Sequence, residues 1–160
     1  MKIAKDGIRS IVKVGYDGRV HKTFRGTDKE ARFENEVRVL NALEARGCDY
    51  VPRLLDQDPE SLTIVTTNCG SPAENSISDA KAEELFAELK SAYGVVHDDP
   101  FPRNITYKSR MGRFCVIDFE LAEVLEDPTQ ECDEEEPHRV LLWSGLRKSG
   151  KRKPKNQDAL

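Results

Sequence analysis

The sequence predicts an α+β domain in which short antiparallel strands accompany two helices. Segments 8–14 and 19–24 are β-branched or alternating, and the turn sequence Gly-Tyr-Asp-Gly at 15–18 separates them, as expected of a hairpin. Segments 27–47 and 78–93 instead repeat apolar residues at the spacing of an amphipathic helix. Hairpins beside isolated helices favour an antiparallel sheet over a parallel one.

Composition restricts the class of protein. The chain has 160 residues, of which 38% are hydrophobic, so we expect one globular domain. A net charge of -4 argues against a general nucleic-acid binder. No segment approaches 18 continuous apolar residues and the start lacks a signal-peptide run, so we expect no membrane association. The four cysteines are widely spaced, which favours reduced thiols and a cytoplasmic protein.

Each helix carries its own start and stop signals. Thr27 and Glu30 fit a capping box at the start of the first helix, and Gly47 ends it. The second helix is expected over 78–93, with Gly94 closing it. The apolar stripe of the first helix consists of Phe33, Val37, Leu40 and Leu43.

The remaining elements are short. We expect a leading strand at 2–5, strands at 51–55 and 62–66 around a turn at 56–61, a linker at 68–72, and a second hairpin formed by 105–107 and 114–117. Beyond these lie an acidic run at 126–136, a short helix at 137–146 and a basic stretch at 147–155, with a frayed tail from about residue 148.

Two charged residues interrupt apolar patterns. Strand alternation places Lys22 on one face with Val20 and Phe24. On the first helix, Glu36 projects between two leucines of the apolar stripe. Each charge alone is compatible with an edge position in water. Facing inward together, they would offset each other's desolvation, which predicts that Lys22 pairs with Glu36.

The second hairpin gathers oxygen ligands at its open end. A turn near residues 110–111 sets the strand register, and that register places Asn104 beside Asp118, with Asp99 just upstream. Carboxylate and amide oxygens are ligands that suit Mg²⁺ when substrate phosphates complete its shell. Asp99 and Asn104 are also residues that cap turns next to proline. Asp118 is harder to explain in that way, because it follows an apolar strand.

These residues together resemble the motifs of protein kinases, over roughly residues 1–125. His97-Asp98-Asp99 followed by Asn104 resembles the catalytic loop, and Asp118-Phe119-Glu120 resembles the metal-binding Asp-Phe-Gly. Val20-His21-Lys22 resembles the end of Val-Ala-Ile-Lys, and the segment 33–37 resembles the helix that supplies its glutamate. All four occur in the order of the family.

The resemblance implies a kinase-like fold and a role for each residue. It implies a small antiparallel-sheet N-lobe with one helix over about 1–67, a truncated helical C-lobe over about 71–147, and a basic tail at 148–160. Lys22 would contact ATP phosphates and be held by Glu36, and Asp99 would orient or deprotonate the acceptor hydroxyl. The remaining site residues are Asn104 and Asp118 as ligands of Mg²⁺, and Thr67 and Asn68 as the backbone that binds adenine.

Departures from the family pattern indicate a minimal, atypical member similar to the Bud32, RIO and lipopolysaccharide-kinase-like group. There is no Gly-x-Gly-x-x-Gly, Asp98 replaces an arginine, Glu120 replaces a glycine, and few residues follow Asp118. The resemblance thus implies an ATP- and Mg²⁺-dependent phosphotransferase acting on a protein Ser or Thr hydroxyl. The alternatives are a catalytically inactive nucleotide-binding pseudokinase and a small-molecule kinase. The basic tail raises nucleic-acid binding as a further alternative, although a solvated segment is the favoured interpretation.

Overall fold

The computed structural model describes residues 1–126 of the chain, and they form an α+β arrangement with two α-helices and a five-stranded antiparallel sheet. Its elements, in chain order, are β1 (Lys2–Asp6), β2 (Ser10–Val14), β3 (Val20–Phe24), α1 (Lys29–Ala45), β4 (Leu54–Asp58), β5 (Thr63–Thr66), β6 (Ser71–Pro72), α2 (Asp79–Tyr93), β7 (Val95–Val96), the 3₁₀ helix η1 (Pro102–Asn104), β8 (Ile105–Lys108), β9 (Arg113–Val116) and β10 (Glu123–Val124).

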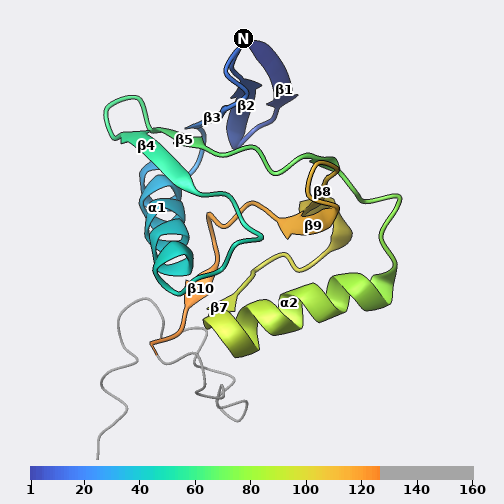
Figure 1. Ribbon diagram of the computed structural model, residues 1–160. Helices are drawn as coiled ribbons and strands as arrows, with labels where there is room; N and C mark the ends of the chain where they lie inside the picture. The colour runs from blue at the N-terminus through green and yellow to red at the C-terminus, as the bar shows by residue number, and fades with distance from the viewer. Residues whose placement is uncertain (127–160) are drawn as a thin grey trace, which may run out of the picture. The chain divides into compact units, whose positions relative to one another are not determined.

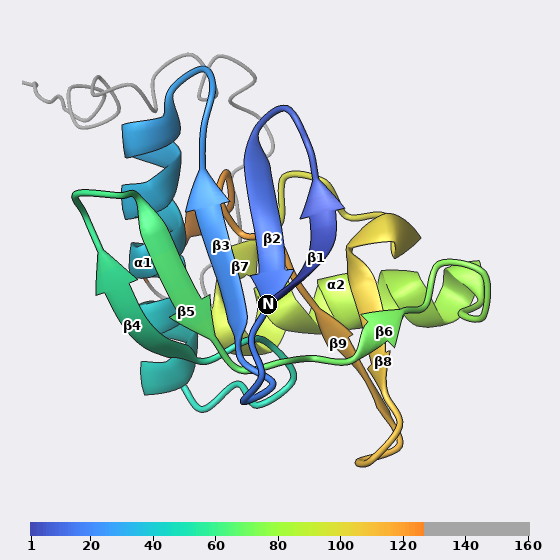
Figure 2. The ribbon, with the colours of Figure 1, turned by 90° about the horizontal axis from the view of Figure 1, so that it is seen from above.

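The large sheet has the strand order β1-β2-β3-β5-β4, and each neighbouring pair is antiparallel. The predicted first hairpin is confirmed as β2 and β3, and the predicted leading strand is confirmed as β1. Helix α1 lies along one face of this sheet and contacts β3, β4 and β5 (Figures 1 and 2). A side chain on that face of β3 therefore points toward the helix.

The second half of the described chain supplies α2, two short sheets and the hairpin that carries Asp118. Strands β8 and β9 pair in the predicted register, with Ile105 opposite Val116, and β6 pairs with β8 (Figure 2). The backbone N–H of Ile117 donates to the carbonyl of Asn104 at 2.9 Å, which extends the pairing to the open end of the hairpin. The predicted position of Asn104 is thereby confirmed.

Helix α2 begins and ends as the sequence predicts. Ser78 is its N-cap, and its side chain accepts a hydrogen bond from the backbone of Lys81 at 3.1 Å. Gly94 ends the helix with a φ of 68°, a left-handed conformation that glycine adopts without steric cost. Local signals therefore determine both ends of this helix.

The predicted capping box at the start of α1 is wrong. Asp28, with a φ of 57°, is the residue that precedes the helix, and no side chain caps the first turn. The carbonyl of Thr27 instead accepts two hydrogen bonds from the guanidinium of Arg32, at 2.9 and 2.7 Å. A buried arginine thus organises this turn in place of the predicted Thr27–Glu30 exchange.

The fourth strand lies three residues later than the sequence predicts. β4 covers Leu54–Asp58, so the expected turn at 56–61 is reduced to the residues after Asp58. The Asp58 carboxylate accepts from the backbone of Glu60 and the hydroxyl of Ser61, and Leu62 adopts a φ of 54° to complete the turn. Val51, the first residue of the predicted strand, is instead buried in the core.

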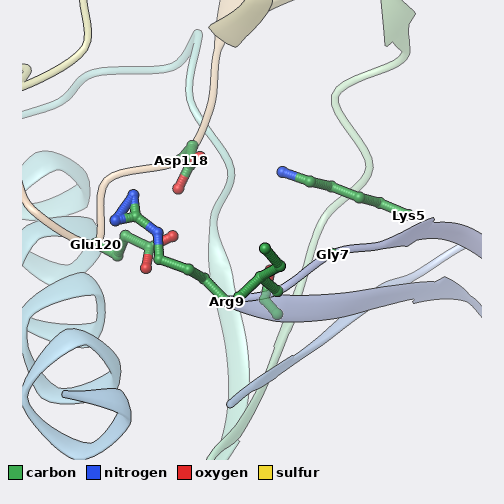
Figure 3. A pocket seen from close by; sticks show the side chains of 7 residues that line it. Lys5, Gly7, Arg9, Asp118 and Glu120 are labelled. Carbon is green, nitrogen blue, oxygen red and sulfur yellow. The ribbon is translucent and has the colours of Figure 1, made fainter. Parts of the chain in front are cut away.

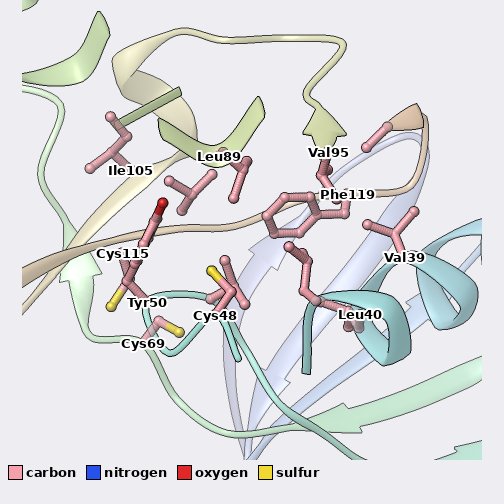
Figure 4. Packing of buried hydrophobic residues seen from close by; sticks show 14 of the residues in the cluster. Val39, Leu40, Cys48, Tyr50, Cys69, Leu89, Val95, Ile105, Cys115 and Phe119 are labelled. Atoms are coloured by element: carbon pink, nitrogen blue, oxygen red, sulfur yellow. The ribbon is translucent and has the colours of Figure 1, made fainter. Parts of the chain in front are cut away.

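The core joins the sheet, both helices and the second hairpin. Phe119 is fully buried and lies between Leu40 of α1 and Val95 of β7, while Leu89 of α2 packs near Ile105 (Figure 4). The three cysteines of the described chain are buried free thiols. Burying the residue after Asp118 in this way fixes where the Asp118 backbone can run.

Residues 1–126 contain no helix long and apolar enough to cross a membrane. The predicted helix at 137–146, the basic stretch and tail, and the acidic run after Glu126 lie outside the described residues.

Candidate functional site

Lys22 of β3 and Glu36 of α1 form a buried ion pair. The Lys22 Nζ lies 2.7 Å from Glu36 Oε1, and the two side chains are only 12% and 4% exposed. The predicted pairing of these inward-facing charges is confirmed. The Lys22 ammonium also lies 4.8 Å from the centre of the Phe24 ring, the apolar neighbour on the same strand face.

The same ammonium is shared with two further carboxylates. Lys22 Nζ lies 3.2 Å from Asp118 Oδ1 and 3.4 Å from Glu120 Oε2, both in the segment that follows β9. Burial alone would lower the pKa of Lys22, but the surrounding carboxylates, Glu36 foremost, raise it above its usual value. Lys22 is therefore a permanent cation that joins β3, α1 and the chain after β9.

A second buried cation, Arg32, holds Glu120. The Arg32 guanidinium donates to Glu120 Oε1 at 2.6 Å and to three backbone carbonyls, those of Arg9, Arg25 and Thr27. All the N–H groups of a guanidinium are used in this way. Sequence analysis did not identify Arg32 as a site residue and noted Glu120 only as a departure from a motif.

Helix α1 is attached to the segment after Asp118 at further points. Asn35 Nδ2 donates to the carbonyls of Glu120 and Ala122, at 3.0 and 2.9 Å. Glu36 Oε2 accepts from the backbone N–H of Phe119 at 3.2 Å. Arg46, at the end of the helix, donates to the carbonyl of Leu125 at 2.8 Å. These contacts fix the helix relative to the carboxylates.

Asp118 occupies a strained backbone position. Its φ of 73° is left-handed, which costs a residue other than glycine about 1–2 kcal/mol. Both neighbours are fixed, because Ile117 is paired with Asn104 and Phe119 is buried and bonded to Glu36. The chain must therefore turn at Asp118, and strain maintained in this way is typical of functional sites.

The buried cluster carries an excess of negative charge. It contains the two cations Lys22 and Arg32 against the three carboxylates Glu36, Asp118 and Glu120. Asp118 is the most accessible of the three carboxylates, with 28% of its side chain exposed. Burial alone would raise the pKa of Asp118, but Lys22 and the Glu120 side chain lower it to about 2. An ionised carboxylate thus faces solvent beside a buried lysine.

Asp99 and Asn104 lie together at the open end of the β8–β9 hairpin, on the side where β8 begins. Asn104 Nδ2 donates to the Asp99 carbonyl and to Asp99 Oδ2, both at 2.8 Å. Arg103 Nε and Nη2 donate to the two Asp99 carboxylate oxygens at 2.9 and 2.5 Å, a bidentate contact that sequence analysis did not predict. The Asp99 carboxylate therefore has a fixed orientation.

His97 connects this loop to the strand that leads to Asp118. Its Nε2 lies 3.0 Å from the carbonyl of Ile117, and its Nδ1 accepts from the backbone N–H of Asp99 at 3.0 Å. These bonds define a neutral tautomer with the proton on Nε2. The buried ring also packs edge-on against Phe86, which holds the loop against α2.

Asn104 and Asp118 have the chemistry of a two-ligand Mg²⁺ site. The amide nitrogen of Asn104 is directed to Asp99, so its oxygen is the atom left for a cation, and among residues 1–126 no group donates to it. Within the same residues no group of three or more His, Cys, Asp or Glu side chains could hold a metal by itself. Magnesium fits such a pair, because phosphates and water complete its octahedron.

Thr67 and Asn68, the residues expected to bind adenine, directly follow β5. They are distant in sequence from the residues of the ion-pair cluster. The backbone N–H of Thr67 donates to the carbonyl of Arg53 at 3.0 Å, so it is already used by β4. The Asn68 side chain accepts from the backbone of Gly70 at 2.9 Å in a local turn. Contacts with a base at this point therefore require other backbone groups than the Thr67 N–H.

Neither a protein-family model nor a curated protein matches this sequence. What the chain does is therefore inferred from the cluster around Lys22 and from the loop that carries Asp99.

Proposed function

We propose that this chain is an ATP- and Mg²⁺-dependent phosphotransferase with a reduced protein-kinase-like fold. The observation that carries the proposal is the Lys22 ammonium, held 2.7 Å from Glu36 of α1 and 3.2 Å from Asp118. Phosphoryl transfer in protein kinases needs this lysine–glutamate pair and a metal-binding aspartate in place together. The antiparallel sheet with α1 on one face supports the same assignment.

The position of each site residue determines its proposed role. Lys22 would bind the α- and β-phosphates, while Asn104 and Asp118 would hold Mg²⁺, which neutralises charge on the phosphates when bound. The acceptor oxygen bonds to the γ-phosphorus as the bond to the β–γ bridging oxygen breaks and ADP leaves. Asp99 accepts the proton of the acceptor hydroxyl. Arg103 and Asn104 keep the Asp99 carboxylate oriented for that step.

The proposed acceptor is a Ser or Thr hydroxyl of a protein, with a small molecule as the alternative acceptor. The three cysteines described are free thiols, which supports the proposed location in the reducing cytoplasm. An inactive nucleotide-binding pseudokinase is the second candidate. It is favoured by Arg103, which occupies both oxygens of the proposed base, and by Glu120, which competes for Lys22.

Transfer of labelled phosphate from ATP tests the proposal. The wild-type chain is incubated with γ-labelled ATP, Mg²⁺ and generic protein substrates, beside Asp99→Asn, Asp118→Asn and the control Glu83→Gln on the exposed face of α2. Asparagine is used at 118 because it tolerates a positive φ. We expect transfer by the wild type and the control, with a loss of about 100-fold or more in each aspartate variant.

Calorimetric titration with Mg-ATP separates the alternatives. Binding without transfer would favour the pseudokinase, and transfer to a small hydroxyl compound alone would favour the small-molecule kinase. Absence of Mg-ATP binding by the folded wild-type chain would refute the proposal as a whole.

A further inference from the structure

The loop between β1 and β2, residues 7–9, is held firmly beside the buried cluster. Within it, the backbone N–H of Gly7 donates to the carbonyl of Ser10 at 2.9 Å. Arg25 donates from Nε to the carbonyl of Gly7 and from its backbone N–H to the carbonyl of Arg9, both at 2.9 Å. The buried Arg32 also donates to the Arg9 carbonyl, at 3.2 Å. The N–H and carbonyl of Gly7 and the carbonyl of Arg9 are thus bonded within the protein itself.

A pocket of about 200 Å³ separates this loop from the carboxylates. Lys5, Arg9 and Ser10 line it from the β1–β2 side, and Asp118 and Glu120 line it from the other. In Figure 3 the Lys5 side chain extends toward Asp118 from one side, while the Arg9 guanidinium lies near Asp118 and Glu120 on the other. Two cationic side chains from one hairpin therefore converge on the accessible carboxylate.

These two cations differ from the buried ones in what they contact. Lys22 and Arg32 are surrounded by carboxylates and carbonyls, whereas within residues 1–126 neither Lys5 nor Arg9 forms a salt bridge. Their charges lie beside a cluster that has an excess of one carboxylate. A ligand that brings both a cation for Asp118 and anionic oxygens for Lys5 and Arg9 would neutralise the whole pocket.

We propose that Lys5 and Arg9 bind the terminal phosphates of the nucleotide, and that they replace the backbone amides of the missing glycine-rich loop. This inference rests on the proposed function and specifies how its site holds a nucleoside triphosphate. Gly7 is the one glycine of the loop, and its N–H is already bonded to Ser10. That N–H is not available to a phosphate, whereas the lysine and arginine side chains can supply charge-assisted hydrogen bonds.

With contacts of this kind, the affinity for a nucleotide depends more on the number of its phosphates than on its base. Each phosphate within reach of Lys5 or Arg9 would add a charged contact, whereas the residues expected to bind adenine, Thr67 and Asn68, do not line this pocket. We therefore expect affinity to rise from AMP through ADP to ATP in the presence of Mg²⁺. Inorganic tripolyphosphate with Mg²⁺, which has no base, should also bind and should compete with Mg-ATP.

The test measures binding of Mg-ATP, AMP and Mg-tripolyphosphate by calorimetry to the full chain and its variants. Lys5→Gln and Arg9→Gln remove one charge each and keep most of the side-chain length. Lys2→Gln is the matched control, because Lys2 lies on the same strand but does not line the pocket. We expect each pocket variant to bind Mg-ATP and Mg-tripolyphosphate about tenfold more weakly, with AMP binding and the circular dichroism spectrum unchanged.

The outcomes distinguish this inference from the function on which it rests. Normal Mg-ATP binding by Lys5→Gln and Arg9→Gln, together with loss of binding in Lys22→Met, would overturn the inference and leave the phosphotransferase intact. An equal weakening in Lys2→Gln would also overturn it, because the effect would then be one of general charge. Absence of Mg-ATP binding by the folded wild type would overturn both.

Discussion

Replacing Arg32 with methionine should be among the most destabilising single changes to this chain. Arg32 is 3% exposed, and it neutralises Glu120, which is itself 7% exposed, at 2.6 Å. Removing one partner of a buried ion pair costs about 3–5 kcal/mol, and, among the residues that the structure describes, Glu120 would keep only the shared Lys22 ammonium, 3.4 Å away, to offset its charge. A domain of this size has a free energy of unfolding of about 5–15 kcal/mol, so the loss is a large share of the total.

Urea unfolding followed by circular dichroism measures this loss. With a typical dependence of about 2 kcal/mol per molar urea, the midpoint should fall by at least about 1.5 M. Arg38→Met is the control, because Arg38 lies on the exposed side of the same helix and, within residues 1–126, its side chain hydrogen-bonds only to that of Asn35. It should change the free energy of unfolding by less than about 0.5 kcal/mol.

A second substitution shows whether charge is the cause. Glu120→Gln in the Arg32→Met background removes the carboxylate that has lost its arginine and should restore about 1 kcal/mol or more. If Arg32→Met unfolds within about 1 kcal/mol of the wild type, or if Glu120→Gln gives no recovery, the account of a charge-dependent cluster is wrong.

Two further predictions concern glycine positions with a positive φ and the loss of stability at low pH. Gly70→Ala would place a Cβ atom 2.1 Å from the Tyr107 carbonyl oxygen at a φ of 97°, so it should cost about 3 kcal/mol in urea unfolding. Gly18→Ala, with a φ of 83° and nothing within 4 Å, should cost only about 1 kcal/mol, and equal costs would contradict the steric argument. The pKa of Asp118 is lowered from 3.8 to about 2, so the unfolded chain takes up this proton first. The resulting stability, about 2 kcal/mol, is complete above about pH 5 and is lost progressively as pH falls toward 2. Asp118→Asn should therefore differ from the wild type less at pH 3 than at pH 6 in urea titrations, and a constant difference would argue against the shift.

The site residues that could be predicted from the sequence are those that interrupt a regular pattern. Lys22 and Glu36 interrupt apolar stripes, and the turn at 110–111 fixes a register that brings Asn104 beside the residue before Asp118. Arg32 broke no pattern, because an arginine four residues before a glutamate resembles an ordinary pair on an exposed helix face. Its guanidinium is held by the carbonyl of residue 9, from the β1–β2 loop, and by those of residues 25 and 27, from the turn just before α1.

Contacts that the sequence pattern does not show also explain two errors in the predicted elements. Thr27 and Glu30 have the right spacing for a capping box, but Asp28 with its left-handed φ precedes the helix, and the Thr27 carbonyl accepts from the buried Arg32 guanidinium. The strand expected at 51–55 moves along the chain because Val51 packs in the core. In both places a contact that the local pattern does not show overrides a local preference.

The attachment of α1 to the chain after Asp118 has a consequence for how activity could be controlled. Moving the helix outward would break the bonds of Asn35, Glu36 and Arg46 together with the Arg32 pair. Several of these are buried and charged, so a displaced helix would be a sparsely populated state. A ligand would need a large preference for that state to turn the protein off. Control by helix displacement is thus disfavoured in this molecule.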